Sequence, residues 1–211
     1  MAIRSRLALS ALLVSTVVGL ASGCSTAPTG SGVPVTPRDL LLDRPPTGFK
    51  QTLDTVLPIA NASSVLATDA ARTGPQLSAF GYSDGAERAW TGSAGEYATA
   101  IVFEFNSTVS PGNFMAFFRN DLKARPSVTL FTDGGEPGAL GFDLYGLNRA
   151  GNAQVFCQGS MFALTNYMFQ LEDCAAGPRY AAAPLTMARG QYERAARLLG
   201  QPITAPSTPS G

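Results

Sequence analysis

The clearest alternation of apolar and polar positions spans residues 97–105, YATAIVFEF. Side chains that alternate with a period of two lie on opposite faces of a strand. One face would carry large apolar side chains and the other small, mostly apolar ones, which predicts a strand covered on both faces. The first face is formed by Tyr97, Thr99, Ile101, Phe103 and Phe105, and the second by Ala98, Ala100, Val102 and Glu104.

Two segments instead have the spacing of amphipathic helices. In the first, Ser110 is suited to the N-cap position and Pro111 to the first turn, and Pro126 ends the helix. The second runs over residues 184–199, and Gly200 stands where a C-terminal cap is expected. The apolar stripes are Phe114, Phe117, Phe118 and Leu122 in the first helix, and Leu185, Ala188, Tyr192, Ala195 and Leu199 in the second.

Weaker patterns predict shorter elements in the rest of the chain. Phe49, Leu53 and Leu57 share one helical face, which predicts a helix over residues 49–57. The other expected elements are a weak helix over 60–71, a break at Gly74 and Pro75, strands over 77–82, 86–91, 128–131 and 140–147, and a turn over 83–85.

Residues 154–173 predict a β-hairpin with two possible registers. A turn at Gly159 and Ser160 has favourable residues, but the chain must then bend back after the second strand. A turn at Thr165 and Asn166 would instead place residues 157 and 174 opposite each other. It would also pair Phe162 with Phe169, Leu164 with Tyr167 and Met161 with Gln170. We favour the Gly159–Ser160 turn, because strands longer than about ten residues are uncommon.

An apolar run over residues 7–20 follows the two cations Arg4 and Arg6, as in a secretory signal peptide. The run ends in residues 20–24, LASGC, with small residues immediately before a cysteine. This ending resembles the lipobox of bacterial lipoproteins, although alanine stands where leucine is most common. The resemblance implies cleavage just before Cys24, a diacylated Cys24 and a position at the outer face of the plasma membrane.

These patterns divide the chain into four parts: a lipoprotein signal peptide (1–23), the lipidated cysteine with a flexible tether (24–37), a globular domain (38–200) and a disordered tail (201–211). The tether is rich in Ser, Thr, Pro and Gly and has no large hydrophobic residue that could order it. The globular domain is expected to be α+β, with an antiparallel sheet packed by at least two helices and one disulfide.

The three cysteines of the chain divide cleanly between two roles. Cys24 goes to the lipid, which leaves Cys157 and Cys174 as an even pair in an exported chain. We therefore expect these two to form a disulfide. In the chain-entropy model a loop of this length stabilises the fold by about 3 kcal/mol.

Charge and chemistry exclude several classes of function. The chain has 15 basic and 15 acidic residues, and without Arg4 and Arg6 the acidic residues are in excess, so no nucleic-acid partner is expected. Residues 81–85, GYSDG, match the nucleophile-elbow pattern, but the chain has no histidine to act as the base. Asp133 and Glu136 share a glycine-rich loop, and two carboxylates do not make a metal site. We expect no metal, no cofactor and no enzymatic activity.

The lipobox, the tether, the strand–helix order and the cysteine pair are together similar to actinobacterial, mycobacterial-type cell-envelope lipoproteins. This resemblance implies a location rather than an activity. The sequence leads us to expect a non-catalytic lipoprotein, attached to the membrane by its lipid, that binds a partner protein or an envelope lipid or glycan. The alternatives are an accessory subunit of a membrane complex and, with less support, a hydrolase.

Overall fold

A computed structural model describes residues 34–66, 70–93, 95–133, 135–147, 154–175 and 183–206 of the chain. These residues form one α+β domain, built on an antiparallel sheet of seven strands with helices on both faces. The expected fold class is therefore confirmed. Cys24, the expected signal peptide and most of the expected tether lie outside the described residues.

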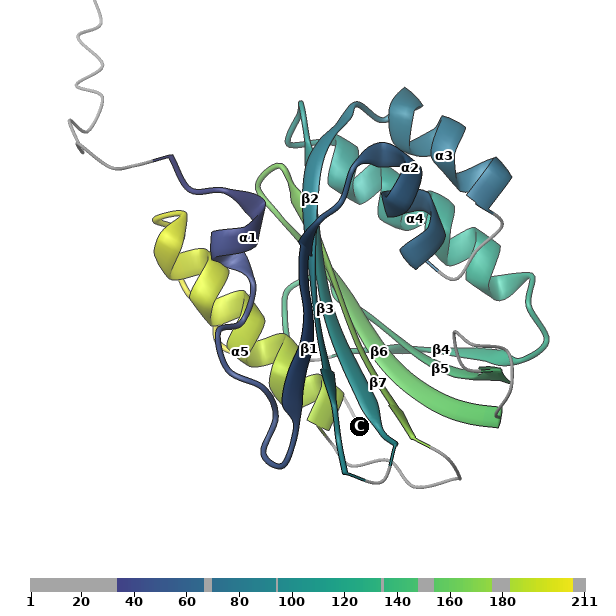
Figure 1. Ribbon diagram of the computed structural model, residues 1–211. Coiled ribbons are helices and arrows are strands. Elements are labelled where there is room, and N and C mark those ends of the chain that lie inside the picture. Colours follow the sequence, from purple (N-terminus) through teal and green to yellow (C-terminus); the bar gives the residue numbers. More distant parts are fainter. Residues whose placement is uncertain are drawn as a thin grey trace, which may run out of the picture. The chain divides into compact units, whose positions relative to one another are not determined.

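The strands follow one another across the sheet in the order β1-β2-β3-β7-β6-β5-β4 (Figure 1). Their bounds are β1 Lys50–Val56, β2 Tyr82–Thr91, β3 Tyr97–Phe105, β4 Val128–Thr132, β5 Leu140–Leu147, β6 Gln154–Leu164 and β7 Tyr167–Ala175. The helices are α1 Pro37–Leu40, α2 Ile59–Val65, α3 Ala70–Ala79, α4 Ser110–Lys123 and α5 Ala183–Leu198.

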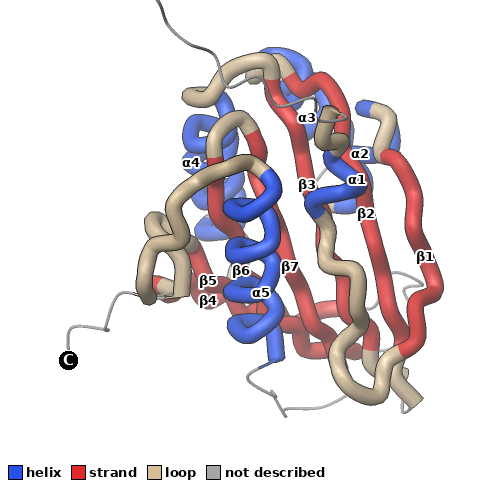
Figure 2. The backbone as a smooth tube through the Cα atoms, turned by 90° about the vertical axis from the view of Figure 1, so that its left-hand side faces the viewer, coloured by secondary structure: helices blue, strands red, loops and turns tan. Residues whose placement is uncertain are grey.

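Helices cover both faces of the sheet, in two separate layers. Figure 1 shows α5 and α1 on one side of the strands and α2, α3 and α4 on the other. In the turned view, α5 lies across β6 and β7 with α1 beside β2 and β3 (Figure 2). Among the described residues, the two large hydrophobic cores therefore lie on opposite sides of the same strands.

Strand β3 has the predicted bounds, and the prediction that it is covered on both faces is confirmed. Its small side chains pack towards α5 and α1, and its aromatic side chains pack towards α4. The first core joins Ala98, Ala100 and Val102 to Phe162, Phe169 and Tyr192, and the second joins Ile101, Phe103 and Phe105 to Phe114 and Phe118.

The hairpin of β6 and β7 turns at Thr165 and Asn166, so the favoured turn at Gly159 and Ser160 is wrong. The alternative register is the one observed, with Phe162 opposite Phe169 and Met161 opposite Gln170. The strands can be this long because α5 and α4 bury them from both sides. Gly159 is instead required by packing, because a Cβ there would lie 2.2 Å from the ring of Phe142 on β5.

Two predictions in the first half of the chain are wrong in type. The segment 49–57, predicted to be a helix, instead contains strand β1 (Lys50–Val56), because these residues pair with β2 at the edge of the sheet. Residues 77–79 continue helix α3, which also contains Pro75, so the expected break and the expected strand are both absent there. The local spacing of apolar residues predicts neither the strand β1 nor the continuation of α3. In both places pairing or packing with other parts of the chain outweighs the local preference.

Smaller differences concern element ends. Residues 83–85 belong to β2, where the register shifts between Tyr82 and Asp84, and do not form a separate turn. Helix α4 has its predicted apolar stripe, but Val109 is its N-cap and Ser110 its first helical residue. Helix α5 also agrees with its predicted range, and Gly200 adopts a positive φ of 64° after it, as a C-terminal cap requires.

The ordered domain extends past both ends of the expected range 38–200. Thr36 caps α1 in a capping box with Asp39, and Val35 packs against the core on the α5 side. At the other end, Gln201 donates its backbone N–H to Ala196, and Thr204 hydrogen bonds with Tyr192. None of the described helices combines the length and the apolar character needed to span a bilayer.

We predict that Gly159→Ala destabilises the domain by about 1–3 kcal/mol, because the added methyl group must displace the ring of Phe142 from a filled core. The midpoint of urea unfolding measures this loss. Gly146→Ala on β5 is the matched control, since no atom lies within 4 Å of a Cβ at that position. An equal loss of stability in both variants would contradict the packing role of Gly159.

Candidate functional site

Two of the site residues predicted from the sequence, Cys157 and Cys174, lie among the described residues, and they form the expected disulfide. Cys157 and Cys174 are directly opposite each other on β6 and β7, and their Sγ atoms are 2.03 Å apart. Both side chains are buried, beside Val155 and Tyr97. The bond therefore closes the open end of the β6–β7 hairpin, and its burial fits a structural role rather than a reactive one. Cys24 lies outside the described residues, so its lipidation stays a prediction.

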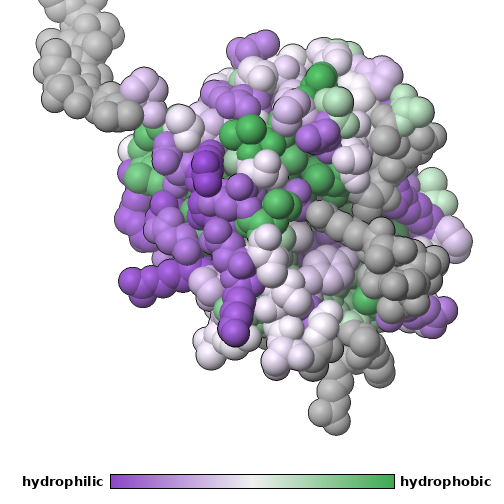
Figure 3. Space-filling model, viewed as in Figure 1, coloured by the Kyte–Doolittle hydropathy of each residue, from purple (hydrophilic) through white to green (hydrophobic). Residues whose placement is uncertain are grey.

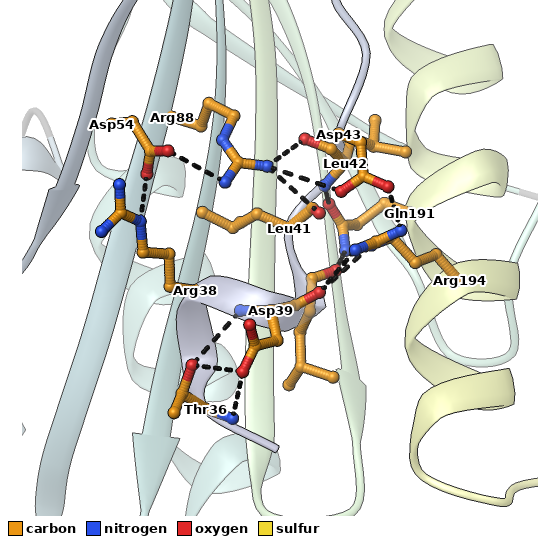
Figure 4. Close-up of polar contacts among 11 residues, drawn as sticks. Thr36, Arg38, Asp39, Leu41, Leu42, Asp43, Asp54, Arg88, Gln191 and Arg194 are labelled. Atoms are coloured by element: carbon orange, nitrogen blue, oxygen red, sulfur yellow. Dashed lines mark hydrogen bonds and ion pairs between the residues drawn. The ribbon is translucent and has the colours of Figure 1, made fainter. Parts of the chain in front are cut away.

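The segment that follows the expected tether is held to the sheet by a buried arginine (Figure 4). Arg88 on β2 is 8% exposed, and its guanidinium donates to the carbonyl oxygens of Leu41 and Leu42. It also forms an ion pair of 3.1 Å with Asp54 on β1. The hydrogen bond from Arg38 is the main reason why the pKa of Asp54 lies below its usual value. One side chain thus joins β1, β2 and the segment after α1.

Two side chains of α5 hold the same segment from the opposite side. Gln191, which is fully buried, donates to the carbonyl oxygen of Leu40 and accepts a hydrogen bond of 3.0 Å from the backbone of Leu42. Arg194 donates to the carbonyl oxygen of Asp39 at 2.9 Å and pairs with Asp43. Figure 4 shows these groups converging on one backbone stretch. Any pull on the chain from its N-terminal side is therefore met by both β2 and α5.

A groove lies between α4, β4 and the loop that leads into β5. Its volume is about 560 Å³, a size that accommodates a small ligand. Ala139 and Leu140 are buried at its floor, whereas Ala116 and Arg119 of α4 are exposed at its rim. The apolar side chains along it are Met115, Ala116, Leu130, Phe131, Leu140 and Ala163.

Arg119 is the one charged residue that lines this groove. No ion pair or hydrogen bond connects its side chain to another described residue. The groove therefore combines an apolar trough with a single cation at its rim. Sequence patterns missed it because Arg119 and Ala116 resemble any solvent-facing positions of a helix, and β4 and the loop reach them only through tertiary packing.

The loop beside the groove carries two buried acids. Asp133 is 5% exposed, and it accepts hydrogen bonds from the Ser160 hydroxyl at 2.6 Å and from the Gly135 backbone at 3.0 Å. Glu136 is 1% exposed, and neither of its carboxyl oxygens has a hydrogen-bond partner among the described residues. The sequence placed both acids in a glycine-rich loop, but their burial could not be read from it.

A second group of buried polar side chains lies on the α4 side of the sheet. Thr99 on β3 and Gln170 on β7 are both about fully buried, and Thr99 Oγ1 and Gln170 Oε1 have no hydrogen-bond partner among the described residues. Glu172, on the neighbouring position of β7, is buried opposite Thr99. The alternation of β3 had placed Thr99 on this face without indicating its polar neighbours.

The nucleophile-elbow pattern has no elbow in the structure. Ser83 is exposed in β2 next to the register shift, and its hydroxyl donates to the backbone oxygen of Glu104 at 3.2 Å. An elbow serine instead sits on a sharp turn from a strand into a helix. Residues 82–85 of the pattern therefore lie in a strand. The expectation that the protein is not an enzyme stays a prediction.

Exposed apolar side chains also gather near one edge of the sheet. Leu53 and Val56 on β1 and Ile59 on α2 are 38%, 55% and 39% exposed. In the view of Figure 3, apolar side chains gather in the upper half of the visible surface and are bordered by polar ones. The register of β1 shifts between Gln51 and Leu53, and such irregularities hinder further strand pairing at an edge.

A comparison of the fold with solved structures finds a similar domain. The crystal structure of the extracellular domain of PknH from Mycobacterium tuberculosis matches with a TM-score of 0.56 and 12% sequence identity, over 78% of this chain and 98% of that one. At this identity the likeness concerns the fold alone. No protein-family model matches the sequence, and no curated protein sequence matches it either.

We predict that Arg88→Lys destabilises the domain by about 1–3 kcal/mol, because an ammonium group cannot replace the planar set of donors to Leu41, Leu42 and Asp54. Hydrogen exchange of residues 34–43 should also accelerate. Arg38→Lys is the control: Arg38 pairs with the same Asp54, but its side chain is 53% exposed, so this substitution should leave the midpoint of unfolding nearly unchanged. Equal effects of the two substitutions would contradict the role of Arg88.

Proposed function

We propose that this protein is a lipid-anchored, extracytoplasmic binding domain, whose groove between α4 and β4 takes an elongated amphiphile with an anionic head. The observation that carries the proposal is the groove itself, with apolar walls and the cation of Arg119 at its rim. An apolar chain would lie against Leu130, Leu140 and Ala163, and a carboxylate or phosphate would meet the guanidinium.

Three features support a position outside the cytoplasm. The chain begins with a cationic and apolar segment that ends at Cys24, in the pattern of a lipoprotein signal. Its disulfide is of the kind that persists in oxidising compartments. The fold is shared with a domain that is itself extracellular. An anchored domain at that place would meet amphiphiles of the cell envelope.

The contacts that hold residues 39–43 to the core fit an anchored domain. Arg88, Gln191 and Arg194 hold residues 39–43 directly after the expected tether. A tethered domain needs its attachment point fixed to the core, because otherwise thermal motion of the membrane and the domain would fray its first segment.

We predict that Cys24→Ala abolishes membrane attachment while export continues. The thiol of Cys24 is the group that would carry the diacylglycerol, so the variant should be found in the soluble envelope fraction or the medium. Cell fractionation and intact-mass analysis of the protein measure both outcomes. Cys157→Ala is the control, since it changes a cysteine that carries no lipid. Continued membrane attachment of the Cys24 variant would contradict the anchor.

The groove is tested with long-chain fatty acids and anionic phospholipids of the same chain length, using displacement of a fluorescent fatty acid from the purified protein. We predict that Ala116→Trp abolishes binding, because the indole fills the groove from an exposed position that tolerates it. Arg119→Gln should weaken binding of the anionic ligands about fivefold, as expected for a partly solvated ion pair of about 1 kcal/mol.

Arg44→Gln is the matched control, because Arg44 is equally exposed and lies away from the groove, in the loop before β1. It should leave the affinity unchanged. If the wild-type protein binds none of these ligands, or if all three variants behave alike, the groove is not the binding site.

A further inference from the structure

Asp133 and the segment 135–139 place two carboxyl groups in the interior of the domain. Asp133 is fully engaged, since Ser160 on β6 and the Gly135 backbone each donate to one of its oxygens. Glu136 is more buried than Asp133, yet both of its oxygens lack a hydrogen-bond partner among the described residues. Two adjacent buried carboxylates that both carry a charge would repel each other in a medium where repulsion is strong.

We propose that Glu136 holds a proton while it is buried and acts as a latch: with that proton residues 135–139 stay packed against β6 and α5, and without it they open. The proton turns Glu136 into a neutral group that can be buried although neither of its oxygens has a partner among the described residues. It also removes the repulsion between Glu136 and the charge of Asp133.

The charged groups around the pair support this assignment. Arg189 on α5 is the nearest cation, but its Nη1 already donates to Gly135 O at 3.0 Å and to Thr204 O at 2.8 Å, and its Nε pairs with Glu193 at 2.8 Å. Arg189 therefore lowers the cost of a charge on Glu136 without pairing with it. From β6 the pair is met by the uncharged hydroxyl of Ser160.

Burial and the neighbouring charges together place the pKa of Glu136 close to neutral pH. Burial, followed by the negative charge of Asp133, raises the pKa of Glu136 to about 7, while the positive charge of Arg189 opposes the shift. A carboxyl group in the unfolded chain loses its proton near pH 4.5. The folded state thus holds a proton that the unfolded state has lost, so stability falls as the pH rises from about 4.5 to about 7.

Opening of the latch would directly change the shape of the groove. The residues that follow Glu136 are Pro137, Gly138 and Ala139, and all three line the groove. On the proposed function, an open loop removes one wall and the ligand is released, so binding is favoured in acid. This consequence rests on the proposed function, whereas the latch itself does not.

The latch is tested with Glu136→Gln, which keeps the shape of the side chain and cannot titrate. Thermal unfolding of the wild-type protein should lose roughly 5 °C between pH 5 and pH 8 relative to the variant, and the variant should be the more stable protein at pH 8. Hydrogen exchange over residues 133–140, corrected for the intrinsic effect of pH, should accelerate at pH 8 in the wild type only. Asp84→Asn, at an exposed carboxyl, should follow the wild-type profile.

A second measurement does not depend on the variant being well folded. The carboxyl carbon of Glu136 in the labelled wild-type protein should titrate near pH 7 by NMR. A titration below pH 5, parallel profiles of wild type and Glu136→Gln, or stabilisation at pH 8 by Ca²⁺ that EDTA reverses would each overturn the latch. If these readouts support the latch while no amphiphile binds at pH 5, the proposed function fails and the latch remains.

Discussion

The structure depends on the central strand β3, which is mostly apolar on both faces. On β3, Ala98, Ala100 and Val102 face α5, while Ile101, Phe103 and Phe105 face α4. A strand of this kind cannot border water, so helices must cover each side of the sheet. On the α5 side, the rings of Phe162 and Phe169 from the neighbouring strands complete the layer over these small side chains. On the α4 side, the rings of Phe114 and Phe118 pack against the aromatic side chains of β3.

The layer on the α5 side is completed by the N-terminal segment, which a buried charge holds in place. Arg88 would be costly at 8% exposure if its charge were unpaired, and its Nη1 and Nη2 groups donate to backbone carbonyls of that segment and to Asp54. The cost of burying it therefore makes the position of residues 41–43 specific. Leu40 and Leu41 in turn cover the core around Trp90. The N-terminal segment of the described domain is therefore held firmly to its core.

The opposite edge of the sheet has a different character. There β4 and the 133–139 loop meet α4 around an open groove, and the loop is held by polar contacts to Ser160 and Arg189 rather than by a deep apolar core. Such a segment is able to move while the central strands stay fixed. In the proposed function, the groove beside this loop takes up and releases the ligand, while Arg88 and Gln191 hold residues 40–42 near the β1–β2 edge of the sheet.

The sequence alone was sufficient for the elements whose pattern reflects burial along a single segment. Examples are the alternation of residues 97–105, the apolar stripe of α4, and the range of α5 with Gly200 after it. The pairing of Cys157 with Cys174 was also predictable, since an exported chain with two remaining cysteines has one way to bridge them. The lipobox-like ending at Cys24 is also a linear signal, and its lipidation stays a prediction.

Tertiary structure alone decided the elements that depend on a neighbour from elsewhere in the chain. Residues 50–56 have helical spacing but form a strand, because β2 offers an edge to pair with. The β6–β7 turn lies at Thr165, because covered strands can exceed the usual length and Gly159 is needed under the ring of Phe142. The groove at Arg119 and the burial of Glu136 arise where segments far apart in sequence meet, and burial by a distant segment leaves no periodic trace in the local pattern.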